Sequence, residues 1–112
     1  MLLFFQKAVP ASQTAVPLSV AGYTSENISY ADDPAYYSRA EAILTAVPTA
    51  GTLTVSVYKN GLALANPMTI SPGTHRASVS LDLPINRGDR VQVMATSGGL
   101  APTTEDLLVI LT

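Results

Sequence analysis

The chain has 112 residues, no cysteine and a formal net charge of −2. Its length fits one domain, and the lack of cysteine excludes disulfides, thiolate metal sites and a cysteine nucleophile. The small net charge gives no indication of binding to nucleic acid or to an anionic membrane. Charged residues make up only 12% of the chain, against 47% hydrophobic residues. A monomer with so few charges would be poorly soluble, so the composition predicts that other subunits cover part of the surface.

The chain begins with a short apolar run of Leu2, Leu3, Phe4 and Phe5. The run is too short for a signal peptide and has no basic segment before it. No apolar stretch approaches the roughly 20 residues needed to cross a bilayer. We therefore expect an edge strand or a strand exchanged with a neighbouring subunit, with residues 1–13 as a possible N-terminal arm of the single domain 1–112.

The first half of the chain has less regular patterns. Residues 15–20 are compatible with a strand, which Pro17 would hold at a sheet edge because proline cannot donate to a ladder. Residues 23–37 are polar and aromatic and are expected to form a long loop. Residues 41–47 have some helix propensity, but the run is short and leads into Pro48, so a strand is preferred.

Residues 52–64 carry the strongest local signal. Leu53, Val55 and Val57 alternate with polar residues, which is the period of a half-buried strand. The pair Asn60-Gly61 follows, and both residues adopt positive φ at low cost. The pattern predicts a tight hairpin whose return strand begins at Leu62.

The second half continues as short strands separated by turn signals. Short or alternating strands are expected over 68–70, 77–83 and 91–95, with Pro84 ending the second of these. Residues 96–104, rich in Gly, Ser, Pro and Thr, are expected to form a loop. The continuous apolar run 107–111 predicts a central strand covered on both faces. Strands at spacings near ten residues predict an all-β, antiparallel two-sheet sandwich of jelly-roll type.

The search for catalytic and metal-binding patterns indicates a protein that is not an enzyme and holds no cofactor or metal. His75 stands in a turn beside Arg76 without a nearby acid, so a solvated turn residue is favoured over a catalytic base. Asp32 and Asp33 precede Pro34, where an Asx turn is favoured over a cation site. No phosphate-binding glycine loop, nucleophile elbow or zinc-binding helix motif is present. The tripeptide Arg87-Gly88-Asp89 matches an adhesion motif, but such short matches often arise by chance, and a structural turn before a strand is favoured over adhesion.

Four of the five tyrosines lie close together in the expected loop: Tyr23, Tyr30, Tyr36 and Tyr37. Tyrosine suits interfaces because it combines a wide apolar ring with a polar tip. A sugar-binding platform, an anchor on a neighbouring protein and a loop folded over the sandwich end all remain open.

Several segments of the second half together resemble a known class of proteins. They are Gly51 to Gly61 (GTLTVSVYKNG), Asn86 to Val93 (NRGDRVQV), the Thr96-Ser97-Gly98-Gly99 stretch and the hydrophobic final strand. From Arg39 to Thr112 the chain resembles small jelly-roll structural proteins of tailed bacteriophages, similar in pattern to the trimeric heads of the tumour-necrosis-factor and C1q class. The first 38 residues show no such resemblance.

The resemblance implies a virion structural protein, foremost a capsid decoration (cement) protein that works as a homo-oligomer, with a trimer favoured. Its partners would be further copies and the major capsid protein. We expect the contacts at Leu2, Leu3, Phe4, Phe5, Tyr30, Tyr36 and Tyr37. The alternative is a fibre-tip or tail-associated module that binds a receptor glycan through the tyrosines.

Overall fold

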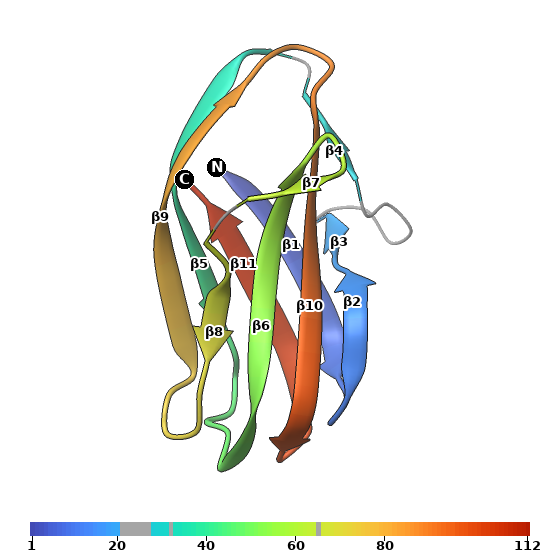
Figure 1. The fold of residues 1–112 in the computed structure, drawn as a ribbon, viewed down its shortest axis with the longest axis vertical. Coiled ribbons are helices and arrows are strands. Elements are labelled where there is room, and N and C mark those ends of the chain that lie inside the picture. Colours follow the sequence, from blue (N-terminus) through green and yellow to red (C-terminus); the bar gives the residue numbers. More distant parts are fainter. Residues whose placement is uncertain (21–27, 32, 65) are drawn as a thin grey trace.

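The computed structural model describes residues 1–20, 28–31, 33–64 and 66–112. These residues form strands, turns and loops, and none of them belongs to a helix that could cross a membrane. The strands make two antiparallel sheets that lie face to face (Figure 1). The prediction of an all-β, two-sheet sandwich is confirmed.

One sheet has five strands and the other has six, named here in spatial order. The five-stranded sheet runs β3 (Ser19–Val20), β1 (Leu2–Val9), β11 (Thr104–Leu111), β5 (Ala35–Ile43), β9 (Arg76–Ile85). The six-stranded sheet runs β2 (Gln13–Pro17), β10 (Arg90–Ala101), β6 (Ala50–Lys59), β7 (Leu62–Ala63), with β4 (Ser29–Tyr30) paired to β10 and β8 (Met68–Ile70) paired to β6.

The strand pairing is nested along the chain. The first strand pairs with the last, β2 pairs with β10, and β5 pairs with β9, all antiparallel. A chain that folds back on itself in this way, with successive strands passing between two sheets, has a jelly-roll topology. The N-terminal strand β1 therefore lies inside its own sheet, between β3 and β11.

The core is the layer between the two sheets, filled by alternate residues of each strand. On β6, Leu53, Val55 and Val57 are buried, and β10 supplies their buried cross-strand partners. From the other sheet, Phe4 and Val109 face this layer as direct partners on β1 and β11. The alternation predicted from the sequence for residues 52–58 places the inward side chains correctly.

The predicted hairpin is confirmed. Asn60 and Gly61 have φ of 52° and 85°, and they join β6 to β7 in antiparallel register. Two successive positive φ values give a turn whose twist matches that of the flanking strands. The return strand is only two residues long.

Three local predictions are wrong. Residues 28–37 are not one long loop, because Tyr30 belongs to β4 while Tyr36 and Tyr37 belong to β5; Tyr23 lies outside the described residues. Residues 96–101 are not a loop, because β10 continues through them with a bulge. Pro84 does not end its strand, since β9 is an edge strand and tolerates a residue without an N–H. A fourth prediction, a strand over residues 41–47, holds only in part, because β5 ends at Ile43.

Candidate functional site

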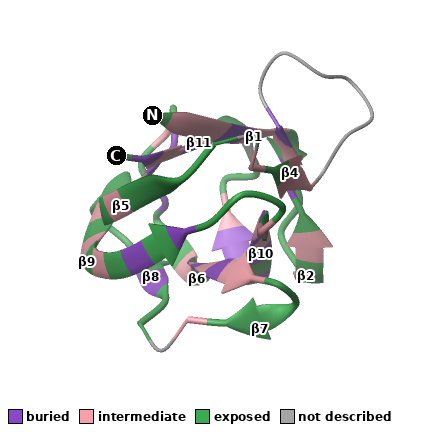
Figure 2. Cartoon of the chain, turned by 90° about the horizontal axis from the view of Figure 1, so that it is seen from above, coloured by how far each residue is buried: buried purple, intermediate pink, exposed green. Residues whose placement is uncertain are grey.

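The outer face of the five-stranded sheet carries a set of large apolar side chains. Residues directly opposite each other in neighbouring strands share a face, so Leu3 lies beside Ile110, and Phe5 lies beside Leu108, which in turn lies beside Ile43. All are half-buried, while their chain neighbours Phe4 and Val109 point into the core. We call Leu3, Phe5, Ile43, Leu108 and Ile110 the apolar patch. Half-buried positions on β1 and β11 are pink in Figure 2.

The apolar patch is central in its sheet. Its residues come from β11, the middle strand of five, and from the two strands that flank it. The outermost strands add polar residues at the same level: Ser19 pairs with Phe5 on one side, and Arg76 pairs with Ile43 on the other. An apolar centre inside a polar rim is the usual anatomy of a protein–protein interface.

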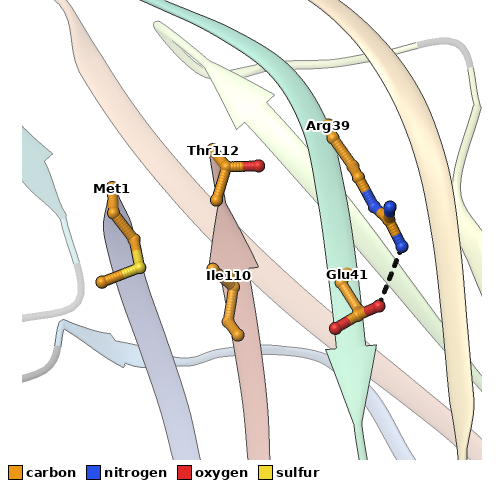
Figure 3. A pocket seen from close by; sticks show the side chains of 5 residues that line it. All are labelled: Met1, Arg39, Glu41, Ile110 and Thr112. Carbon is orange, nitrogen blue, oxygen red and sulfur yellow. Dashed lines mark hydrogen bonds and ion pairs between the residues drawn. The ribbon is translucent and has the colours of Figure 1, made fainter.

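Two shallow hollows mark the ends of the apolar patch. One, of about 340 Å³, is lined by Phe5, Ile43, Thr45, Asp106, Leu107 and Leu108. The other, of about 360 Å³, is lined by Met1, Arg39, Glu41, Ile110 and Thr112, and Figure 3 shows Ile110 between Met1 and Glu41. The first hollow is almost entirely apolar, which suits a hydrophobic side chain better than a polar ligand.

The charges on this face border the apolar patch, and Glu41 on β5 lies directly opposite Ile110. Glu41 accepts from Arg39 at 3.0 Å and from Arg76 at 2.8 Å, so one carboxylate holds two guanidinium groups. The hydrogen bond from Arg76 is the main cause that lowers the pKa of Glu41, and the positive charges of Arg76 and Arg39 add to it. Glu41 is therefore ionised at neutral pH, and the cluster forms a fixed polar border beside Ile110.

The opposite face of the sandwich has a different character. Outward positions of β6 and β10 pair Thr54 with Thr96, Ser56 with Met94 and Tyr58 with Gln92. Most of these side chains are neutral and hydrogen-bonding, and a surface of this kind is stable in contact with water. Among the residues that the structure describes, the two broad faces are therefore unequal, and only the five-stranded sheet presents a continuous apolar centre.

The predicted N-terminal contact residues divide between core and surface. Leu2 and Phe4 face inward, and Phe4 is fully buried. Leu3 and Phe5 face outward and belong to the apolar patch. That any of the four contacts a partner stays a prediction, but only Leu3 and Phe5 are placed to do so without unfolding β1.

Sequence reasoning missed the other three members of the apolar patch, Ile43, Leu108 and Ile110. A signal was present, because the continuous apolar run 107–111 predicted a strand covered on both faces. The described residues cover only one face of β11, where Leu107, Val109 and Leu111 are buried. The second cover is missing from the described part of the chain.

The predicted tyrosines lie at the end of the sandwich near the β9–β10 turn. Tyr30 and Tyr36 are exposed, at 60% and 57%, whereas Tyr37 packs partly against the core. The Tyr36 hydroxyl donates to Asp82 Oδ1 at 2.9 Å, and this hydrogen bond is the main cause that raises the pKa of Tyr36. The structure separates Tyr37 from the two exposed rings instead of gathering all three in one loop.

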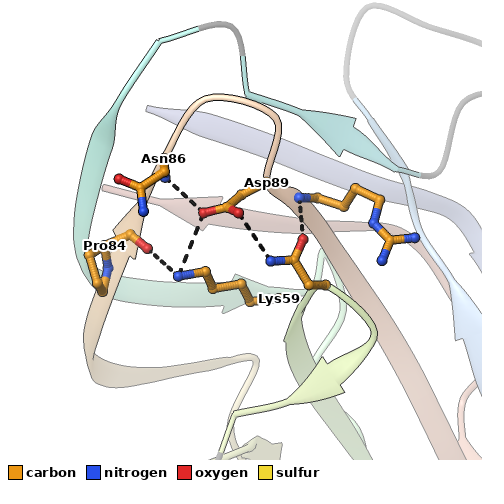
Figure 4. Close-up of polar contacts among 6 residues, drawn as sticks. Lys59, Pro84, Asn86 and Asp89 are labelled. Atoms are coloured by element: carbon orange, nitrogen blue, oxygen red, sulfur yellow. Dashed lines mark hydrogen bonds and ion pairs between the residues drawn. The ribbon is translucent and has the colours of Figure 1, made fainter.

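The remaining candidate groups have structural partners. Asp89 accepts from the Asn86 backbone N–H at 2.8 Å and from Asn60 Nδ2 at 3.1 Å, with Lys59 Nζ 3.6 Å away (Figure 4). Its carboxylate is thus held inside its own turn, which does not favour recognition of Arg87-Gly88-Asp89 by an adhesion receptor. His75 Nδ1 lies 3.2 Å from the Leu44 carbonyl oxygen.

The described residues contain no group of three or more histidine, aspartate or glutamate side chains that could hold a metal ion. Of the candidate cation ligands, Asp32 lies outside the described residues and Asp33 is exposed.

Comparison with known proteins assigns no family to the chain. No family model matches the chain, and no curated protein matches it. Among solved structures, a family 35 carbohydrate-binding module from Clostridium thermocellum is similar, with a TM-score of 0.44, 17% identity, and coverage of 98% of this chain and 92% of that module. CBM35 from Paenibacillus barcinonensis has a TM-score of 0.43, 15% identity, and coverage of 100% and 92%. What those modules bind is not carried over to this chain.

Proposed function

We propose that this chain is a non-enzymatic structural protein of a virion, most directly a capsid decoration protein on the particle surface. The single observation that carries an assembly role is the apolar patch. The virion setting is supported by the sequence resemblance from Arg39 to Thr112 to bacteriophage jelly-roll proteins.

A contact role follows from the energetics of the apolar patch. Burying apolar surface contributes on the order of 25 cal/mol per Å², so the area that the five half-buried side chains still expose would contribute a few kcal/mol when a partner covers it. Each contact would be modest, but a cement protein makes many simultaneous contacts on a shell, and these combine through multivalency. Catalysis needs a cleft with convergent polar groups, and the two described hollows are shallow.

Co-sedimentation with purified capsids of the source virus tests the proposal. The wild-type chain is expected to pellet with capsids, whereas Leu108→Lys, which places a charge in the apolar patch, should bind at least tenfold more weakly. Thr54→Lys is the matched control, because Thr54 also faces outward from a central strand but on the polar face. If wild type stays in the supernatant, the decoration role is wrong.

The glycan-binding alternative stays a prediction. It would rest on Tyr30 and Tyr36, whose rings are exposed, and no longer on Tyr37, which packs partly against the core. A chain that ignores capsids but binds a glycan array, and loses that binding in Tyr36→Ala, would replace the decoration role with this one.

A further inference from the structure

The partner that covers the apolar patch can be inferred from the shape and charge of the face. We propose that it is a second copy of this chain, with the five-stranded sheets of two copies in contact. This inference rests on the proposed function only in taking the apolar patch as a contact surface. It assigns the chain itself as the occupant, so capsid binding would depend on the apolar patch through the multivalency of the joined copies.

The face is large enough for a stable contact between copies. With strands about 4.8 Å apart and a rise of about 3.3 Å per residue, the four strands of this sheet that have eight or more residues present roughly 500 Å² in flat projection. A standard interface buries about 800 Å² of accessible surface per partner, which includes the relief of the side chains. The molecule measures 41 × 28 × 20 Å, so the broad faces are the ones that can supply such an area.

The charge distribution favours self-contact. When two copies of one face meet, groups near the symmetry axis approach their own equivalents, and like charges there are repelled. The centre of this face, at Leu108 and Ile110 on β11, carries no charge. The rim carries both signs, with Glu41 between Arg39 and Arg76 on one side. Further charges lie beyond the Phe5–Leu108 pair. Lys7 is two residues from Phe5 on β1, and Asp106 is two residues from Leu108 on β11.

The composition of the whole chain fits a self-assembling subunit. Only 14 of its 112 residues are charged at neutral pH, six basic and eight acidic. The polar outer face of the six-stranded sheet can remain in water, so a pair joined through the apolar patch would expose its more soluble faces. Sheets stacked face to face lie about 10 Å apart, which allows Leu108 of one copy to approach Leu108 of the next.

A charge-pairing experiment tests the inference in solution, without capsids. Light scattering of wild type is expected to give twice 11.7 kDa, because two copies joined through the same face form a closed pair. Leu108→Lys and Leu108→Glu should each give 11.7 kDa, because each places like charges against each other across the contact. When the two variants are mixed, the oligomer should return, since Lys and Glu then face each other. Thr54→Lys should keep the wild-type mass.

Each outcome decides the inference. A wild-type mass of 11.7 kDa at 1 mM would overturn it, and so would a Leu108→Lys variant that keeps the wild-type mass. A mixture that stays monomeric while circular dichroism shows both variants folded would also count against it. These results are separable from the decoration role: a monomer that still pellets with capsids through the apolar patch refutes self-contact alone, and an oligomer that ignores capsids refutes decoration alone.

Discussion

Gly51 allows close approach of β6 and β10, the two central strands of the six-stranded sheet, because it has no side chain. It has φ of +76°, and a Cβ built on it would overlap the carbonyl group of Gly99. The reason is the bulge in β10, where Ala101 pairs with Ala50 and Gly98 pairs with Thr52, so that extra residues of β10 oppose Gly51. Only glycine at position 51 lets β6 pair with the bulged part of β10 without a clash.

Replacing Gly51 with alanine is therefore expected to destabilise the chain more than an ordinary glycine replacement. Gly88 is the matched control, because its φ is +88° but nothing lies within 4 Å of an added Cβ. Gly88→Ala should cost the backbone term alone, about 1–2 kcal/mol. Gly51→Ala should cost that plus the clash with backbone atoms, about 3 kcal/mol or more. Urea unfolding at one protein concentration measures both, and equal losses would show that the bulge relaxes freely.

At the scale of elements, Asp89 joins the β6–β7 hairpin to the β9–β10 turn. The backbone hydrogen bond from Asn86 is the main cause that lowers the pKa of Asp89, and the bond from Asn60 and the charge of Lys59 add to it. Lys59 also donates to the Pro84 carbonyl at 2.7 Å. One carboxylate thus ties two connections that lie about 30 residues apart in the sequence.

Asp89→Asn is expected to lower the free energy of unfolding at pH 7. Because the folded pKa lies below the unfolded value of about 3.9, the stabilisation is complete above that value and is lost as the pH falls through the folded pKa. The difference between wild type and Asp89→Asn should therefore shrink as the pH falls below about 4. Asp33→Asn serves as control, because Asp33 is exposed and hydrogen-bonds to no described residue. Urea unfolding against pH measures both, and a difference that stays constant to pH 2 contradicts the assignment.

Elements with a local signal could be predicted from the sequence, and those set by tertiary pairing could not. The β6–β7 hairpin follows from alternation and Asn60-Gly61, both of which act within a few residues. The strand character of residues 96–101 depends on pairing with β6, so a Gly- and Ser-rich stretch becomes strand against its own propensity. The sequence predicts a loop at Tyr36 and Tyr37 for the same reason. Their strand structure depends on pairing with β9, which is distant in the sequence.

The candidate site could be predicted only in part. Leu3 and Phe5 stood in an apolar run that indicated contacts, but that run did not show which of its residues face outward. Ile43 has an ordinary local context, and it joins the apolar patch only because β5 pairs with β11. A surface assembled from three strands that are distant in sequence requires the strand order, which local patterns do not contain.

At the scale of the whole molecule, the two unequal faces of the sandwich determine which surfaces an oligomer would leave exposed. Contact through the five-stranded sheet would leave the sandwich ends and the polar six-stranded face exposed. Tyr30, on β4 of the six-stranded sheet, lies at one of those ends and would remain accessible in an oligomer joined by the apolar patch. Self-assembly and recognition of a further partner would then use different surfaces.

Self-contact through the apolar patch also predicts how the thermal stability depends on concentration. If folding and association are linked, the oligomer is favoured by mass action, and Tm rises with protein concentration. With an unfolding entropy of about 2.1 cal/mol/K per residue, a dimer of this length should gain roughly 3 °C for each tenfold increase. Leu108→Lys should melt at a Tm independent of concentration, and Thr54→Lys should behave as wild type. Differential scanning calorimetry over a hundredfold range of concentration makes the measurement. A wild-type Tm that stays constant above the association threshold would show that the subunits fold first and that the apolar patch adds nothing to their stability.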